Sequence, residues 1–234
     1  MSPVSLPHAR RLVAPLLVVA GIAGAWAWMR WPDVHVIAEA NPASVAEIDR
    51  AERATGIHIP LAWTGLHDIS PQLLLAVLVA QDLEFFGPRE PSSAGSAPGD
   101  AEPALELPPR VSVVTRSLAS DLWLAPAGVM RRLREYALSF DLERFVGKRR
   151  ILELYLNVAE FGPGVYGAPA AARRYFHKAP LFLTEEESAM LAAGLARPSV
   201  WNPTVTTPEY RARVAVIRNR MASAEFLWRR MLEL

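Results

Sequence analysis

The chain has 234 residues, of which 51% are hydrophobic and 21% charged, and its formal net charge is +1. This length predicts one large domain with a short appendage rather than two full domains, and the composition excludes a disordered or fibrous chain. The balanced charge argues against a nucleic-acid partner. Cysteine is absent, which excludes disulfides, thiolate nucleophiles and cysteine-built metal sites.

An uncharged apolar run near the start of the chain predicts a membrane anchor. Residues 12–29 contain no charged side chain, and a helix of this length spans about 27 Å, close to the thickness of a bilayer core. Arg10 and Arg11 precede the run and Trp31 follows it, which favours a cytoplasmic N-terminus. The alternative is a signal peptide cleaved near residues 25–27. We expect a cytoplasmic tail at 1–11, a transmembrane anchor at 12–31 and a domain outside the cytoplasm at 32–234.

Helix start and stop signals follow the anchor. Asn41, with a proline after it, predicts a helix start, and Gly56 predicts the end of that helix. Ser70, also followed by proline, predicts the start of a second helix over residues 72–86. Because this segment is apolar on every side, we expect it to be the buried central helix.

Residues 87–109 differ from their surroundings in composition. This segment has six prolines in 23 residues and no aromatic or β-branched residue, so it lacks the apolar side chains that would offset the entropy of ordering it. We expect a flexible loop inserted within one domain. A linker between two domains is the alternative.

The second half of the chain is dense in helix signals. Thr184 and Glu187 form a capping box, and β signals are scarce, so the sequence predicts a mostly helical domain. The expected helices cover residues 130–146, 149–159, 168–176, 185–196 and 208–232.

The residues that could carry chemistry are carboxylates and cations. The five His are scattered without metal-ligand spacing, and no G-x-S-x-G motif is present. If the central helix continues to residue 86, Gln81 and Glu84 share one face, with Asp82 turned about 100° away; a solvated helix end is the alternative interpretation. Arg131 and its neighbours surround Glu135, a pattern suited to an anionic, phosphate-bearing substrate. The alternative there is a surface salt bridge worth tenths of a kcal/mol.

Residues 151–178, ILELYLNVAEFGPGVYGAPAAARRYFHK, resemble the corresponding stretch of the monofunctional biosynthetic peptidoglycan transglycosylases. This is the glycosyltransferase family 51 module, which is shared with bifunctional penicillin-binding proteins. The resemblance runs from about residue 69 to residue 201. It includes the family's R-K-x-x-E motif at Arg131, Arg132 and Glu135, and its K-x-x-I-L-E-x-Y-L-N motif from Lys148 to Asn157.

The first two motifs of the family are altered in this chain. In the E-D-x-x-F motif, Asp82 and Phe85 are retained, but Gln81 stands in the place of the glutamate. In the GGST-I-TQQ motif, Ser112 and Thr115 are retained, but both glycines and both glutamines are lost. By resemblance the missing glutamate is the catalytic base, and Glu84 is the one nearby substitute.

The resemblance implies a lysozyme-like bilobal helical domain behind one N-terminal transmembrane helix, with the N-terminus in the cytoplasm and the domain in the periplasm. It implies polymerisation of lipid II into glycan strands at the inner membrane, with other cell-wall synthesis proteins as candidate partners. A divalent cation, Mg or Mn, is implied as a cofactor, although the sequence shows no metal site built by the protein. An apolar rim against the bilayer is expected at Leu122, Trp123, Leu124, Val129 and Met130.

The site residues implied by the resemblance are catalytic Gln81, Glu84 and Glu135, and substrate-binding Asp82, Phe85, Ser112, Thr115, Arg131, Arg132, Lys148 and Asn157. Because an amide cannot accept a proton near neutral pH, Gln81 leaves two hypotheses open. The chain is either a peptidoglycan glycosyltransferase that is slow or uses Glu84, or a membrane-anchored pseudoenzyme that binds lipid II or a cell-wall synthesis protein. A lysozyme-like hydrolase is disfavoured because it requires two working carboxylates.

Overall fold

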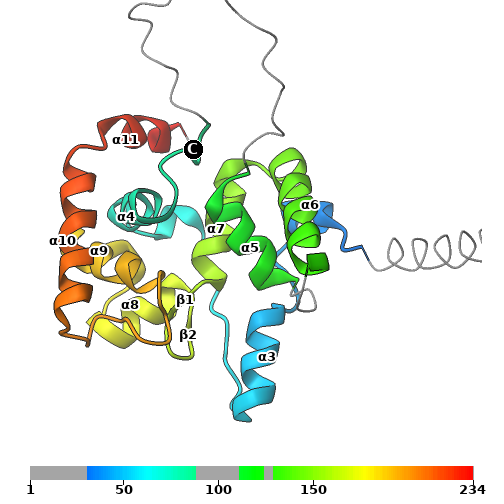
Figure 1. The fold of residues 1–234 in the computed structure, drawn as a ribbon, viewed down its shortest axis with the longest axis horizontal. Helices are drawn as coiled ribbons and strands as arrows, with labels where there is room; N and C mark the ends of the chain where they lie inside the picture. The colour runs from blue at the N-terminus through cyan, green and yellow to red at the C-terminus, as the bar shows by residue number, and fades with distance from the viewer. Residues whose placement is uncertain (1–30, 88–110, 124–128, 234) are drawn as a thin grey trace, which may run out of the picture. The chain divides into compact units, whose positions relative to one another are not determined.

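A computed structural model describes residues 31–87, 111–123 and 129–233 of the chain (Figure 1). The chain divides into a first unit of residues 1–33 and a second unit of residues 34–234. The predicted anchor at 12–31 and the predicted loop at 87–109 lie outside the described residues, except for Trp31 and Gly87. Within the described ranges, no helix is both long enough and apolar enough to cross a membrane.

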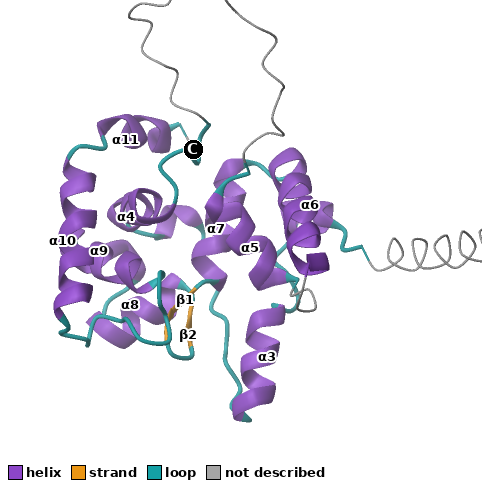
Figure 2. Ribbon diagram, in the orientation of Figure 1, coloured by secondary structure: helices purple, strands orange, loops and turns teal. Residues whose placement is uncertain are grey.

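Helices make up most of the described structure, which confirms the prediction of a mostly helical domain (Figure 2). The α-helices are α2 (Val34–Glu39), α3 (Ala46–Thr55), α4 (Pro71–Gln81), α5 (Val113–Leu122), α6 (Val129–Phe145), α7 (Lys148–Val158), α8 (Ala168–Phe176), α9 (Glu185–Gly194), α10 (Pro208–Ala222) and α11 (Glu225–Leu232). Two 3₁₀ turns, η1 (Leu66–Asp68) and η2 (Pro180–Phe182), and two short strands, β1 (Glu160–Gly162) and β2 (Val165–Tyr166), complete the described elements.

The central helix α4 is surrounded by α9, α10 and α11 (Figure 1). Residues 73–79 are buried without exception, as the apolar sequence of this segment predicts. Ser70 caps the start of the helix by accepting the N–H of Gln72, and Pro71 follows it, so both predicted start signals are confirmed. The α9 helix begins with the predicted capping box of Thr184 and Glu187.

A second group of helices consists of α5, α6 and α7, with α2 packed on α6 and α3 packed on α5. The helix α5 is central to this group because it contacts both α6 and α7. Its inner face buries Val114 and Leu118 completely. The end of α4 and this second group together hold most of the predicted site residues.

The glycine-rich segment after α7 forms a small antiparallel hairpin of β1 and β2. Gly164 lies in the turn with φ 69°, and Gly167 has φ 82°, a conformation that other residues adopt only with strain. A Cβ atom on Gly167 would lie 2.6 Å from the carbonyl oxygen of Asn157. The hairpin therefore packs directly against the end of α7.

Besides the end of α4, which lies at Gln81 rather than residue 86, two predicted helix boundaries were wrong. The helix expected from Asn41 begins at Ala46 instead, and the side chain of Asn41 binds Arg150 rather than capping a helix. The helix expected over residues 208–232 breaks into α10 and α11 at Ser223, whose hydroxyl donates to backbone carbonyls of the preceding turn. The break turns the buried Leu227 inward and lets α11 pack on α4.

Candidate active site

Asp82 connects the end of α4 to the start of α5. Its buried carboxylate accepts hydrogen bonds from Ser112 Oγ at 2.5 Å and from the N–H of Val114 at 3.4 Å. Ser112 is the N-cap of α5, and its hydroxyl oxygen accepts the N–H of Thr115 at 3.2 Å. These acceptors satisfy N–H groups that have no partner within the helix, and a negative charge at a helix start is favourable. The retained parts of the first two motifs are therefore in direct contact.

A chain of polar contacts continues from Thr115 to the later motifs. Thr115 Oγ1 donates to Glu143 Oε1 at 2.5 Å, and Glu143 pairs with Lys148, the first residue of α7. The Nζ atom of Lys148 lies 4.6 Å from the centre of the Phe85 ring, a cation–π distance. Phe85 is fully buried and lies three residues after Asp82. The network thus closes on itself and joins four helices.

A second polar cluster bridges α5 and α6. Arg131 Nε donates to Glu135 Oε1 at 2.7 Å, and Arg131 Nη2 donates to Ser120 Oγ at 3.2 Å. Ser120 Oγ in turn donates to Glu135 Oε1 at 3.2 Å. The side chain of Arg131 is 39% exposed and that of Glu135 is 25% exposed. The guanidinium is therefore partly accessible to a phosphate-bearing ligand, which suits its donors.

The structure corrects the prediction for the residues that follow α4. The helix ends at Gln81, and Asp82 has the non-helical angles φ −158° and ψ 83°, because its carboxylate is used at the start of α5. Gln81 is half-buried, and its Nε2 atom is buried without a hydrogen-bond partner among the described residues. Glu84 is exposed in the turn beyond the helix, so it does not share a helical face with Gln81.

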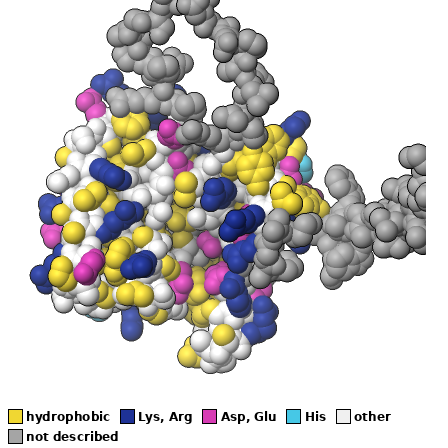
Figure 3. Space-filling model, in the orientation of Figure 1, with side chains coloured by type: hydrophobic (Ala, Val, Ile, Leu, Met, Phe, Trp, Pro, Cys, Tyr) yellow, Lys and Arg dark blue, Asp and Glu magenta, His cyan; other side chains and the backbone are white. Residues whose placement is uncertain are grey.

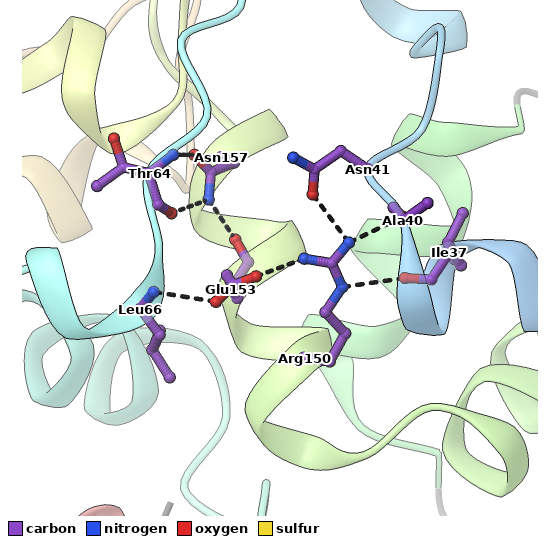
Figure 4. A network of polar contacts seen from close by, with 8 residues as sticks. All are labelled: Ile37, Ala40, Asn41, Thr64, Leu66, Arg150, Glu153 and Asn157. Carbon is purple, nitrogen blue, oxygen red and sulfur yellow. Dashed lines mark hydrogen bonds and ion pairs between the residues drawn. The ribbon is translucent and has the colours of Figure 1, made fainter.

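The side chain of Asn157 is buried and binds backbone groups of this chain. It is 1% exposed, its Oδ1 accepts the N–H of Thr64 at 2.8 Å, and its Nδ2 donates to the carbonyls of Thr64 and Glu153 (Figure 4). These bonds occupy the amide, and its substrate-binding role stays a prediction. Arg132, by contrast, is exposed on α6, where it is accessible to a ligand.

Sequence reasoning missed three polar residues in this region: Glu143, Ser120 and Asp121. Glu143 binds Thr115 and Ser120 binds Glu135, both far away in the sequence. The charges that act on Asp121 also belong to distant residues, so no local pattern could identify these three. Asp121 is half-buried beside a cavity of about 230 Å³, which Glu47 and Glu160 also line. Its pKa is raised to about 8, mainly by burial and further by the charges of Glu47 and Glu160, while Arg50 opposes the shift.

Metal-binding capacity depends on clustered ligands. Within the described ranges, no group of three or more His, Asp or Glu side chains is arranged to hold a metal ion. Magnesium commonly binds through one or two carboxylates together with substrate phosphates. Glu135, which is partly exposed and paired with Arg131, is the residue that would supply such a carboxylate.

Comparison with known proteins shows which family the chain resembles. A family model described as transglycosylase matches residues 111–222, the segment that carries α5, Glu135 and Glu143 of α6, and Lys148. A biosynthetic peptidoglycan transglycosylase of Rhodospirillum centenum is 34% identical over 219 residues, covering 91% of this chain and 90% of that protein. Proteins of the same description are 38% identical over 157 residues in Shewanella frigidimarina (65% of this chain, 69% of that protein) and 36% identical over 167 residues in Escherichia coli (68% and 67%).

The mostly helical fold and these matches define a transglycosylase. The chain belongs to the family of biosynthetic peptidoglycan transglycosylases.

Proposed function

We propose that this protein is a peptidoglycan glycosyltransferase that binds lipid II and polymerises it into glycan strands, slowly because of Gln81. The observation that carries the proposal is the closed network of Asp82, Ser112, Thr115, Glu143 and Lys148. Residues that are scattered over 67 positions of sequence meet in one place, and α5 and α6 link this place to the partly exposed pair of Arg131 and Glu135. Family membership supports the assignment of glycosyl transfer to this meeting point.

The reaction requires an anion-stabilising group. The 4-hydroxyl of the acceptor sugar attacks the anomeric carbon of the lipid-linked donor, inverts it, and expels undecaprenyl pyrophosphate. Arg131, near the start of α6, and Lys148, just after its end, supply cationic groups. They pair with Glu135 and Glu143 respectively. These two glutamates are eight residues apart on one helix, so they are separated by about 12 Å along its axis. We propose that the Arg131 end binds the pyrophosphate, assisted by the exposed Arg132.

The reaction also requires a base, and this chain has Gln81 where the family has its catalytic glutamate. The loss of a general base typically reduces the rate about 10²- to 10⁴-fold. Gln81 cannot take a proton from the acceptor hydroxyl, and Glu84 lies in an exposed turn rather than on the helix. A second function is therefore a candidate on this observation alone: a pseudoenzyme that retains lipid II binding without turnover.

We also propose that the protein acts at the inner membrane, with the domain in the periplasm and residues 12–31 as its anchor. Leu122 of the predicted apolar rim is buried, so it cannot face lipid. Leu133, Tyr136 and Phe140 of α6 instead remain 59%, 40% and 38% exposed. Their i, i+3, i+7 spacing places them on one face, and Figure 3 shows hydrophobic side chains gathered beside basic ones over α6. This combination favours an anionic lipid surface.

The location is tested by reporter fusions to the full-length chain. A reporter that is active only in the periplasm should work at the C-terminus and fail at the N-terminus. Recovery of a soluble mature chain beginning near Trp28 would show cleavage instead of anchoring.

The activity is tested with purified full-length protein and labelled lipid II. We expect measurable binding and weak polymerisation, seen as short glycan products on a gel. Binding without any product supports the pseudoenzyme. A protein that neither binds nor polymerises lipid II contradicts both functions.

A further inference from the structure

Arg150 of α7 binds a part of the chain more than a hundred residues earlier. Its Nε donates to the carbonyl of Ile37 at 3.0 Å, and its Nη2 donates to the carbonyl of Ala40 at 2.8 Å and to Asn41 Oδ1 at 2.9 Å (Figure 4). The two carbonyls lie at the end of α2, where helical C=O groups have no partner within the helix. One planar guanidinium can serve several acceptors at once. Arg150 therefore fixes the backbone of residues 37–41.

The same face of α7 also holds the chain just before α4. Arg150 pairs with Glu153, whose Oε2 accepts the N–H of Leu66 at 3.0 Å. One turn further, Asn157 exchanges two hydrogen bonds with the backbone of Thr64 (Figure 4). The three side chains follow one another at i, i+3 and i+7, so they share one helical face. This face holds both ends of the stretch that contains α3.

Between these two fixed ends, α3 packs against α5. Ile48 of α3 is 4% exposed, so the contact buries apolar surface. Glu47 of α3 lines the cavity of about 230 Å³ that Ser117 and Asp121 of α5 line from the other side. The position of α3 therefore determines one side of the environment of α5.

The helix α5 in turn carries three of the side chains that build the candidate active site. Ser112 and Thr115 belong to the closed network, and Ser120 links α5 to the pair of Arg131 and Glu135. A displacement of α5 would alter both polar clusters. Misplacement of catalytic groups by about 1 Å can reduce a rate about 10²-fold.

We propose that Arg150 is a positioning residue for the glycosyl transfer: it holds α3 against α5 and so fixes the α5 side chains that complete the candidate active site. The proposal rests on the proposed function, because it assigns Arg150 a part in lipid II binding and transfer. The hydrogen bonds of Arg150 hold residues 37–41 and Glu153, so we assign it an action through α3 and α5.

The test compares the full-length protein with Arg150→Gln, Arg150→Lys and, as a control, Arg53→Gln, which removes an exposed Arg of α3. Three quantities are measured: hydrogen exchange of α3 and α10 amides, the titration midpoint of the Asp121 carboxyl carbon, and the Kd for lipid II. We expect Arg150→Gln to accelerate α3 exchange about tenfold or more, as the loss of charged hydrogen bonds predicts, and to weaken lipid II binding about tenfold, with α10 unchanged. The pKa of Asp121, which is raised mainly by burial and further by the charge of Glu47, should fall when α3 moves away, because the carboxyl becomes better solvated and Glu47 leaves.

Arg150→Lys should lie between wild type and Arg150→Gln, because a lysine keeps the pair with Glu153 but cannot serve all the acceptors of the guanidinium. Arg53→Gln should behave as wild type. Unchanged α3 exchange in Arg150→Gln overturns the inference, and so does equal acceleration in α10, which would indicate global destabilisation. Faster α3 exchange with unchanged lipid II affinity overturns the link to substrate. If the wild type does not bind lipid II, the proposed function and the substrate part of this inference both fail, while the exchange data still decide whether Arg150 holds α3.

Discussion

The carboxylate of Asp82 accepts a 2.5 Å hydrogen bond from the hydroxyl of Ser112, thirty residues further along the chain. Both groups are buried, so removing one leaves the other without its partner. We expect Asp82→Ala to lower the free energy of unfolding by about 1–3 kcal/mol and Ser112→Ala by a similar amount. The two losses should not add in the double variant. Chemical denaturation of the soluble domain or of the detergent-solubilised protein measures all three.

Asp68→Ala is the control for this series, since the side chain of Asp68 is 58% exposed. It should change stability by less than about 0.5 kcal/mol. Full additivity of Asp82→Ala and Ser112→Ala would show that the two residues contribute independently, contrary to the contact described.

A second prediction concerns the pair of Arg131 and Glu135. Arg131→Ala should weaken binding of lipid II, or of a pyrophosphate-containing analogue, by about 10- to 100-fold, since charge-assisted bonds to phosphate contribute about 1.5–3 kcal/mol. Glu135→Gln should also weaken it. Arg229→Ala is the matched control, because Arg229 forms the same kind of i, i+4 pair with Glu225 on the exposed helix α11. Equal losses in Arg131→Ala and Arg229→Ala would indicate a non-specific charge effect.

A third prediction follows from the pKa of Asp121. The folded chain holds this proton up to about pH 8, whereas the unfolded chain releases it near pH 4. Unfolding therefore releases a proton between these values, so the free energy of unfolding should fall as pH rises from about 4 to 8, by up to about 1.4 kcal/mol per pH unit, and then level off.

Asp121→Asn has no proton to lose, and it should reduce this slope and be more stable than wild type at pH 9. A smaller slope should persist because burial also raises the pKa of Glu160. Thermal unfolding at pH 5, 7 and 9 measures the effect, with Asp68→Asn as the exposed control. A wild-type slope that survives unchanged in Asp121→Asn would assign the titration to another group.

Local signals predicted helix existence well and helix ends less well. The caps at Ser70 and Thr184 and the stop at Gly56 appear where the sequence places them, because capping depends on neighbouring residues. The end of α4 at Gln81 was not predicted, because it depends on Asp82 binding a helix start thirty residues away. The helix α5 was not predicted either, although Ser112 acts as its N-cap.

The residues of the candidate site also divide into those that the sequence predicted and those that depend on distant contacts. By resemblance Asp82, Ser112, Thr115 and Lys148 are site residues, and the structure places them in one polar network. Their role in the reaction stays a prediction. Glu143 was missed, although it joins Thr115 to Lys148. Its role depends on the packing of α5 against α6 and α7, which no local pattern encodes.

The central claim is that this chain keeps the site for lipid II but lacks an effective base at position 81. The most direct test is the initial rate of polymerisation of labelled lipid II by the full-length wild type and by Gln81→Glu. The account predicts a feeble wild-type rate that rises by at least tenfold in Gln81→Glu, within the scale of about 10² to 10⁴ for a positioned base unless the altered second motif limits the gain. A robust wild-type rate that Glu84→Gln abolishes, and that Gln81→Glu does not raise, would contradict it.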